Sequence, residues 1–483
     1  MSLNTENSNG TLTKENRLGN EKVLRLVFSM SLPMMFAMLV QSLYNIVDSI
    51  FVSRISEDAL TSVSLAFPVQ SLMIAVGVGT AVGINAFLSR ALGAKLQNKV
   101  NAIASMSLIL ATLSSIIFML IFGIGAEAFY KIQSSNENIV SMGTAYLQVV
   151  SYACIGFFIQ VSCEKLLSAT GRTVLSMLTQ LSGAVINIIL DPIFIFGYLG
   201  VPKMGVAGAA VATVIGQFVA AIFGLYLNIR HNPDIRINIL EFWKTTLRFK
   251  LHLTKEIYEI ALPSILMAGI GSVMTYAMNQ ILLVYSSTAA AIFGVYFRLQ
   301  SFVFMPIFGL NYGIIPIISF NYGANNKGRI KEVVKIGMIT AVSYSVLGFI
   351  CFNIFPKDLL LIFDANPNML SIGIPALKII SVSFILAGFS IISIATTQAL
   401  NKSIYALWVS ILRQLVALLP LAYIFSRVGG LELIWWSFPA AEIVSFACAL
   451  FFLRRSIKTR FAEIEANNLK SLQENKDRSI AYE

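Results

Sequence analysis

Twelve apolar stretches, each long enough to cross a bilayer as a helix, constrain this chain more than any other feature of its sequence. A bilayer core of about 30 Å needs roughly 20 apolar helical residues. Only 12% of the 483 residues are charged, against about 25% in soluble globular proteins. The sequence therefore predicts an all-α integral membrane protein and excludes a soluble enzyme. The expected spans are 24–52, 58–89, 100–125, 139–166, 172–198, 205–229, 256–285, 288–320, 332–355, 368–398, 403–427 and 430–453.

The basic residues lie almost entirely on one side of these spans. Of the 35 Lys and Arg residues, 27 fall in the two tails and the even-numbered loops, and three fall within spans. The odd-numbered loops carry only Arg54, Lys131, Lys203, Lys357 and Arg427. Cytoplasmic loops are the ones enriched in Lys and Arg. We therefore expect a multi-pass protein of the cytoplasmic (inner) membrane with both termini in the cytoplasm. The net charge of +11 is a topology signal and does not predict a nucleic-acid partner.

An internal repeat with an offset of 230 residues divides the chain into two halves. Leu32-Pro33 matches Leu262-Pro263 at this offset, and the register continues through the matched pairs Gln70 and Gln300, Gly79 and Gly309, Gly83 and Gly313, Ser89 and Ser319, Gly93 and Gly323, and Ser151 and Ser381. Such repeats are typical of secondary transporters. Each repeat has six spans, so both halves enter the membrane in the same direction. We expect two six-helix bundles related by a pseudo-twofold axis along the membrane normal.

The repeat predicts five segments. They are a cytoplasmic tail (1–22), an N-terminal six-helix bundle (23–229), a cytoplasmic interfacial linker (230–255), a C-terminal six-helix bundle (256–453) and a second cytoplasmic tail (454–483).

Ionisable residues inside spans are costly and mark functional sites or buried ion pairs. Asp48 shares the first span with Gln41, Tyr44 and Asn45. Because residues spaced by three and four lie on one helical face, these four side chains form a polar stripe that cannot face lipid. We interpret the stripe as lining a cavity, with Gln41, Tyr44 and Asn45 as a candidate proton or substrate site, and buried packing is the alternative.

Asp191 in the fifth span lies one turn after Asn187 and immediately before Pro192. Proline has no N–H, so the carbonyl of Ile188 loses its usual partner. A carboxylate, an amide oxygen and a free carbonyl within one turn suit a proton or a small hard cation. Counting residues from the span ends places Asp48, Asp191 and Thr213 at a similar depth.

The other buried charges have a less certain meaning. Glu164 lies one turn from Gln160 and next to Lys165, so a proton or substrate site and a snorkelling ion pair are both compatible with the sequence. In the second half, Arg413 and Glu442 lie on consecutive spans, which predicts a structural ion pair. Arg298 and Lys378 have no evident acidic partner. They line the transport path, or bind backbone carbonyls, or lie outside the true span boundaries.

The sequence resembles the multidrug and toxic compound extrusion (MATE) family, and within it the MepA-like and DinF-like bacterial branches, over roughly residues 20–453. The resemblance is carried by LPMMFAMLVQSLYNIVDSIFV in the first span, GINAFLSRALGAK at the end of the second, NIILDPIFIFGYLGVPKMGVAGAAVATVIGQ in the fifth and sixth, and FNYGANN in the second repeat.

The resemblance implies a coupling-ion site in the N-terminal bundle. Matching motif by motif places the first-span aspartate at Asp48, and it places the asparagine and aspartate of the fifth span at Asn187 and Asp191. The remaining members of the implied coupling-ion site are Thr213 and Tyr146. A fourth-span glutamate of the MepA-like branch matches Glu164. The chain departs from another branch, which has acidic residues in the seventh and tenth spans where this chain has Asn279 and Lys378.

Together these features predict an antiporter coupled to H⁺ or Na⁺ that exports amphipathic organic compounds by alternating access, a multidrug efflux function linked to antibiotic resistance. Its expected partners are small organic substrates and membrane lipids, and it is expected to be monomeric. No catalytic residues, structural metal or cofactor beyond the coupling ion are expected, because no metal-binding or nucleophile constellation is present and the chain has only two His residues. The alternative is a flippase for a lipid-linked saccharide or lipid precursor, for which the unpaired bases of the second half could hold a pyrophosphate.

Overall fold

A computed structural model describes residues 16–363 and 365–480, and over these residues the chain forms helices and no strand. Ten helices are long and apolar enough to cross a membrane singly, and two bent helix pairs raise the number of spans to twelve. The all-α membrane fold and the number of spans are as predicted. The spans of the N-terminal bundle are α2 (Val23–Ser53), α3 (Glu57–Gly93), α4 with η1 and α5 (Gln97–Phe118, Met119–Gly123 and Ile124–Gln133), α6 with α7 (Glu137–Tyr152 and Ile155–Ala169), α8 (Thr173–Phe196) and α9 (Val206–His231).

The C-terminal bundle repeats this order, and a short helix joins the two bundles. Its spans are α11 (Leu247–Leu283), α12 (Ser287–Gly323), α13 (Lys327–Ile354), α15 with α16 (Pro367–Ser381 and Ser383–Ala399), α17 with η3 and α18 (Ser403–Ile411, Leu412–Leu418 and Leu419–Trp435) and α19 (Ser437–Ile480). The remaining short elements are α1 (Arg17–Asn20), η2 (Tyr198–Gly200), α10 (Ile239–Trp243) and α14 (Pro356–Leu361).

The two bundles bend at equivalent places. The fourth span bends by 46° between α6 and α7, and the tenth bends by 44° between α15 and α16. One hydrogen bond is also found in both bundles, between residues that match at the 230-residue offset. Ser89 Oγ donates to the Ala169 carbonyl at 2.8 Å, and Ser319 Oγ donates to the Ala399 carbonyl at 3.1 Å. The repeat seen in the sequence is therefore a repeat of structure.

The bundles meet through reciprocal contacts of α3 with α12. A Cβ atom on Gly93 would collide with the Phe320 carbonyl, and a Cβ atom on Gly323 would collide with the Arg90 carbonyl. Gly93 corresponds to Gly323 and Arg90 to Phe320 at the 230-residue offset. Such mutual contacts are those of a twofold interface. The pseudo-twofold axis thus passes between these two glycines, which the interface needs because only glycine allows the backbones so close.

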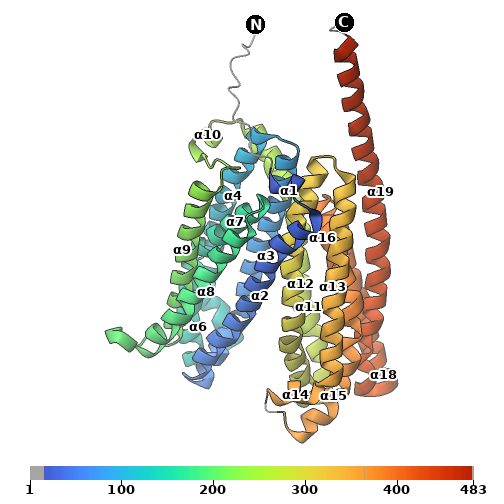
Figure 1. Ribbon diagram of the computed structural model, residues 1–483. Helices are drawn as coiled ribbons and strands as arrows, with labels where there is room; N and C mark the ends of the chain where they lie inside the picture. The colour runs from blue at the N-terminus through green and yellow to red at the C-terminus, as the bar shows by residue number, and fades with distance from the viewer. Residues whose placement is uncertain (1–15, 364, 481–483) are drawn as a thin grey trace.

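The bundles lie close together at the end that carries both termini and diverge toward the opposite end (Figure 1). We call these the terminal end and the open end. Helices α2 and α12 are in close contact from the terminal end inward, with Gly313 against Ser31 and Gly309 against Met35. Further along α2 toward the open end, Ser42 Oγ lies 3.2 Å from Ser301 Oγ of α12.

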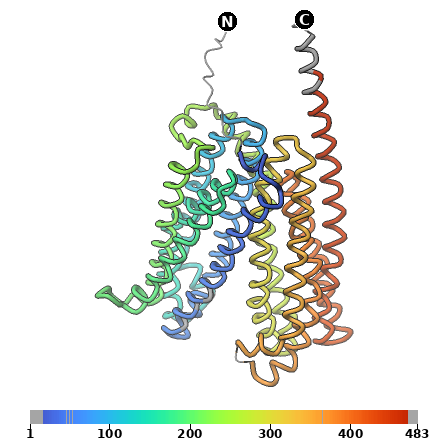
Figure 2. The backbone as a smooth tube through the Cα atoms, viewed as in Figure 1, coloured from blue at the N-terminus to red at the C-terminus, as the bar shows by residue number. Residues whose placement is uncertain are grey.

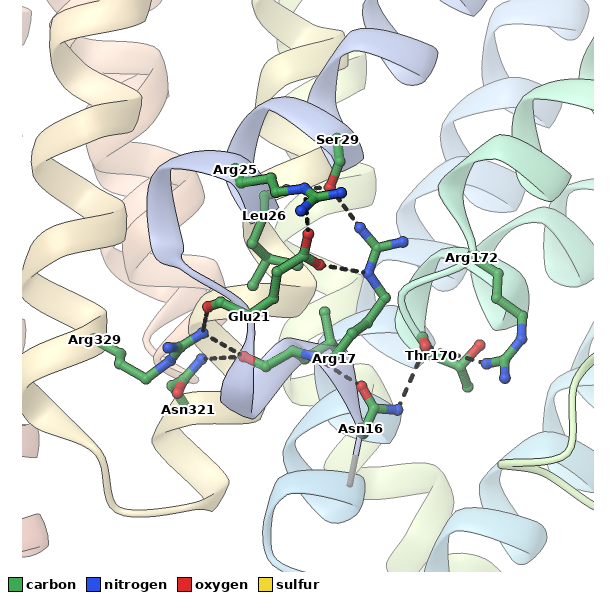
Figure 3. A network of polar contacts seen from close by, with 11 residues as sticks. Asn16, Arg17, Glu21, Arg25, Leu26, Ser29, Thr170, Arg172, Asn321 and Arg329 are labelled. Atoms are coloured by element: carbon green, nitrogen blue, oxygen red, sulfur yellow. Dashed lines mark hydrogen bonds and ion pairs between the residues drawn. The ribbon is translucent and has the colours of Figure 1, made fainter. Parts of the chain in front are cut away.

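A strap formed by residues 16–21 connects the two bundles at the terminal end (Figure 3). Leu18 is fully buried there, and its carbonyl accepts hydrogen bonds from Asn321 Nδ2 at 3.1 Å and Arg329 Nη2 at 3.2 Å. On the other side, Asn16 Nδ2 donates to Asp234 Oδ1 at 3.3 Å. The end of the polar segment predicted as a tail is therefore packed between the bundles. Residues 1–15 lie outside the described part of the chain.

Three segments differ from the expected span boundaries. The twelfth span begins at Ser437 and not at 430, because α18 kinks at Gly430 (φ 68°) but continues to Trp435, and the chain turns only at Trp436. Helix α19 continues without interruption from the twelfth span to Ile480, so the second tail is helical where it is described (Figure 1). The linker is shorter than the predicted range 230–255, because α9 extends to His231 and α11 begins at Leu247.

Candidate coupling-ion site

The polar stripe of α2 turns toward the interior of the N-terminal bundle. Gln180 Nε2 of α8 donates to Gln41 Oε1 at 3.4 Å, and Tyr44 makes a side-chain hydrogen bond with Thr213 of α9. The side chain of Asn45 lies outside the described part of the structure. One face of α2 therefore packs on α8 and α9, while Ser42 faces α12 of the other bundle.

Asp191 and Asn187 form the centre of the site on α8. Asp191 is fully buried and Asn187 nearly so, because Gly183, one turn before Asn187, lets α9 approach closely at Gly216. Turning the Asn187 amide to match its neighbours lets its nitrogen donate to Asp191 Oδ2 at 3.0 Å. Its oxygen then accepts from the Thr213 backbone N–H at 2.8 Å and from Thr213 Oγ1 at 3.1 Å. Amide orientation is assigned from such partners.

The five residues that the resemblance implied for the coupling ion come together from four helices. Asp48 of α2 is close enough to Asp191 of α8 to interact with it electrostatically. Tyr146 of α6 interacts in the same way with Asp48 and Tyr44, and its hydroxyl accepts from Gln70 Nε2 at 2.9 Å. The structure thus places Asp48, Tyr146, Asn187, Asp191 and Thr213 in one cluster.

The cluster carries two carboxylates and no nearby base. Neither Asp48 nor Asp191 has a Lys or Arg among the described residues that act on it. Asp48 Oδ1 is buried and has no hydrogen-bond partner within the described part of the chain. Buried charges are normally paired or bound to an ion. An arrangement of two acids, an amide and two hydroxyls is therefore suited to take up a cation or a proton.

Glu164 lies apart from this cluster, on α7. It accepts a hydrogen bond from Gln160 Nε2 at 2.9 Å. Lys165 does not snorkel. It is buried, and its Nζ lies 3.5 Å from the centre of the Tyr312 ring on α12. The pair therefore lies at the contact between the two bundles, which sequence reasoning missed because such a contact between repeats leaves no signal in spacing.

The bases of the second bundle divide into two kinds. Arg413 Nη1 lies 3.5 Å from Glu442 Oε2, so these two form an ion pair between η3 and α19. Arg298 and Lys378 are exposed and belong to no ion pair among the described residues. Arg298 lies one turn before Ser301, which contacts Ser42, so it lies on the face that α12 presents to α2.

Two polar residues near the cluster were not predicted from the sequence. Gln70 is the partner of Tyr146, and its match to Gln300 in the repeat was a signal that could have singled it out. Gln217 lies one turn after Thr213, and its Oε1 is buried without a partner in the described structure. A polar residue at i+4 from an implied ligand was the available signal for it.

Twelve membrane-spanning helices in two pseudo-symmetric bundles, with a buried acidic cluster in one of them, define a secondary transporter. The chain matches the MatE family model over residues 33–193 and 261–424, one stretch in each repeat. It therefore belongs to the MatE family, whose members are transporters and not enzymes.

Similar proteins span nearly the whole chain. The "Multidrug export protein MepA" of Staphylococcus haemolyticus is 27% identical over 435 residues, which cover 89% of this chain and 93% of that protein. The protein of the same name from Staphylococcus saprophyticus is 26% identical and covers 92% and 96%.

Solved structures show the same fold. A structure described as the outward-facing conformation of a multidrug resistance MATE family transporter has a TM-score of 0.86 at 24% identity, covering 93% of this chain and 99% of that one. A Pyrococcus furiosus transporter of the MOP superfamily, described as having a binding pocket of reverse polarity, gives the same values.

Proposed function

We propose that this protein is a cation-coupled antiporter that exports amphipathic organic compounds across the cytoplasmic membrane by alternating access. The observation that carries the proposal is the pairing of Asp48 and Asp191 inside the N-terminal bundle, with neutral partners and with no base among the described residues acting on them. The similarity to proteins named multidrug export protein supports the substrate class.

The coupling ion neutralises this cluster. Two carboxylates in a low-dielectric interior repel each other strongly, and one H⁺ or Na⁺ relieves that repulsion. Carboxylate, amide and hydroxyl oxygens from Asp191, Asn187 and Thr213 supply hard ligands for Na⁺. A proton would bind to either carboxylate. The geometry is compatible with both ions, so the gradient experiment below distinguishes them.

Helix α2 links ion binding to the bundle interface. Its polar stripe enters the cluster, and its opposite side contacts α12 through Met35 and Ser42. Repacking of α2 on loading the ion therefore alters the contact between the bundles, with Pro33 as a flexible point inside the helix. Assigning the terminal end to the cytoplasm by its excess of basic residues makes the arrangement in Figure 1 the one that opens outward.

One ion per substrate supplies enough energy for export. A unit charge moving through 100 mV releases about 2.3 kcal/mol, which sustains roughly a fifty-fold concentration gradient.

Ethidium efflux from proteoliposomes tests the proposal, with a proton gradient and a sodium gradient imposed in turn. We expect one of the two gradients to drive efflux by the unmodified protein. Efflux should be lost in Asp191→Asn and kept in Asp358→Asn, which changes an exposed aspartate of α14. Undiminished efflux by Asp191→Asn would disprove the coupling site.

A flippase for a lipid-linked precursor is the second candidate, and the exposed bases Arg298 and Lys378 favour it. In that case neither gradient would drive efflux of any dye, and the protein would translocate a fluorescent pyrophosphate-linked lipid. Arg298→Gln should then abolish translocation. In the antiporter it should leave the choice of coupling ion unchanged.

A further inference from the structure

A groove with a volume of about 400 Å³ lies between α13 and the C-terminal extension of α19. These two helices lie next to each other in the C-terminal bundle, near the terminal end (Figure 2). Lys331 and Lys335 lie one turn apart on α13 at the groove, and the rest of its lining is apolar, including Met338, Ile339 and Ile457.

The groove runs from the headgroup level into the acyl level of a bilayer. Helix α13 begins at Lys327, so Lys331 lies about 6 Å and Lys335 about 12 Å from its start. Headgroup regions are roughly 5–8 Å deep on each side of the hydrocarbon core, and lysine side chains reach outward to them. Met338 and Ile339 lie deeper, about 17 Å from the start of the helix.

The equivalent place in the N-terminal bundle is filled by the chain itself. At the 230-residue offset, Asn101 and Ser105 correspond to Lys331 and Lys335. The Arg236 backbone N–H donates to Asn101 Oδ1 at 2.8 Å, and the Asn238 backbone N–H donates to Ser105 Oγ at 3.1 Å. Phe242 of the linker is buried nearby. The main chain of the linker and the Phe242 ring thus cover the place in the N-terminal bundle that is equivalent to the groove.

In the C-terminal bundle the chain after the last span continues as a straight helix, so the groove stays open. The Lys331 Nζ lies 5.4 Å from the Phe461 ring, and the nearby Glu465 is bound by Lys327 at 2.5 Å. Neither Lys331 nor Lys335 belongs to an ion pair among the described residues. Two cations therefore lie at the mouth of an apolar groove, and the nearest acid that acts on Lys331, Glu465, is already ion-paired with Lys327.

We propose that this groove binds an anionic phospholipid of the leaflet at the terminal end. The phosphate lies between Lys331 and Lys335, and one acyl chain lies against Met338, Ile339 and Ile457. The ligand takes the place that the linker occupies in the first repeat. This site is separate from the coupling-ion cluster and depends on neither the coupling ion nor the exported substrate.

Native mass spectrometry of the delipidated full chain tests the proposal, with phosphatidylglycerol and phosphatidylcholine added in parallel. We expect the unmodified protein to retain one phosphatidylglycerol molecule more tightly than any phosphatidylcholine. Each lysine near a membrane surface is worth about a fivefold change in binding, so Lys331→Gln/Lys335→Gln should weaken this binding about thirtyfold. Lys95→Gln/Lys470→Gln removes two exposed lysines elsewhere on the same end and should leave it unchanged.

A second variant tests the apolar part without changing charge. Met338→Trp fills the groove and should also remove the tightly bound lipid. Equal phosphatidylglycerol binding by the unmodified protein and the double-lysine variant would overturn the proposal, as would equal retention of phosphatidylcholine. Ethidium efflux by the same variants is a separate measurement, so failure of the lipid site leaves the antiporter proposal unaffected.

Discussion

Asn187 bonds Asp191 through its amide nitrogen and Thr213 through its amide oxygen, and it thereby joins α8 to α9 at the centre of the acidic cluster. Asp48 reaches the same place from α2. A single asparagine thus fixes the position of the carboxylate on which coupling depends, without supplying charge itself.

Replacing Asn187 with Ala should weaken coupling more than folding. The change removes the hydrogen bond that holds Asp191 and leaves a buried acid with fewer partners, at a cost of about 1–3 kcal/mol. With Na⁺ as the driving ion, we expect the concentration for half-maximal efflux to rise about tenfold, because a ligand is lost. With H⁺ as the driving ion we expect it to fall, because the ionised carboxylate loses a hydrogen-bond donor and binds a proton more readily. Asn228→Ala is the matched control, because this buried asparagine bonds the Cys163 carbonyl far from the cluster. An unchanged ion dependence in Asn187→Ala would contradict the role given to the amide.

The glycine contact between the bundles gives a prediction about stability. In Gly93→Ala the new Cβ meets the Phe320 carbonyl of the other bundle, and neither backbone can yield easily. Overpacking of this kind costs about 1–3 kcal/mol. Gly269→Ala is the same substitution in α11 with open space around it, and it should be neutral or stabilising by up to about 1 kcal/mol. Thermal unfolding in detergent measures both, and equal midpoints would argue against the tight interface.

The sequence predicted the spans, the repeat and the α2 stripe because each depends on spacing within the chain. Helical periodicity put Gln41, Tyr44 and Asp48 on one face, and the structure shows that face turned inward. Contacts between helices from different repeats have no such signature. The position of Lys165 over Tyr312 and the burial of Leu18 between the bundles could therefore not be predicted.

The start of the last span shows a second limit. The residues after Gly430 are as apolar as a membrane helix, so hydropathy assigned them to the twelfth span. In the structure these residues form the end of α18 after a kink at Gly430, and the next helix starts only at Ser437, after a turn at Trp436. Hydropathy reports whether a segment tolerates lipid and does not report where a helix breaks.

The ion pair of Arg413 and Glu442 should behave as a structural pair. Glu442 is buried and Arg413 is partly exposed, so Arg413→Met leaves an acid without its base inside the bundle, at about 3–5 kcal/mol. Arg413→Met/Glu442→Leu removes both charges and should recover much of that stability. Thermal unfolding of the two variants gives the comparison. A double variant as unstable as the single one would mean that each residue has another role.

Lys165 and Tyr312 should be energetically coupled across the bundle contact. Desolvated cation–π pairs contribute up to about 2 kcal/mol, and this ammonium lies directly over the ring. A double-mutant cycle with Lys165→Met and Tyr312→Leu should give a coupling energy of about 1–2 kcal/mol in thermal unfolding. Strictly additive effects would show that the two residues only happen to be close.

The strap of residues 16–21 should favour the arrangement in which the terminal end is closed. Leu18 is buried between the bundles, and its carbonyl is bound by Asn321 and Arg329 of the C-terminal bundle. Leu18→Ala leaves a cavity that costs about 2–5 kcal/mol, and only the closed arrangement bears this cost. Spin labels at Lys95→Cys and Glu332→Cys, with Cys351 and Cys448 changed to Ser, report the distance between the bundles at this end. We expect a longer-distance population to grow at least tenfold in Leu18→Ala but not in Leu240→Ala, which truncates an exposed leucine of the linker. An identical distance distribution in both variants would show that the strap does not control the closed end.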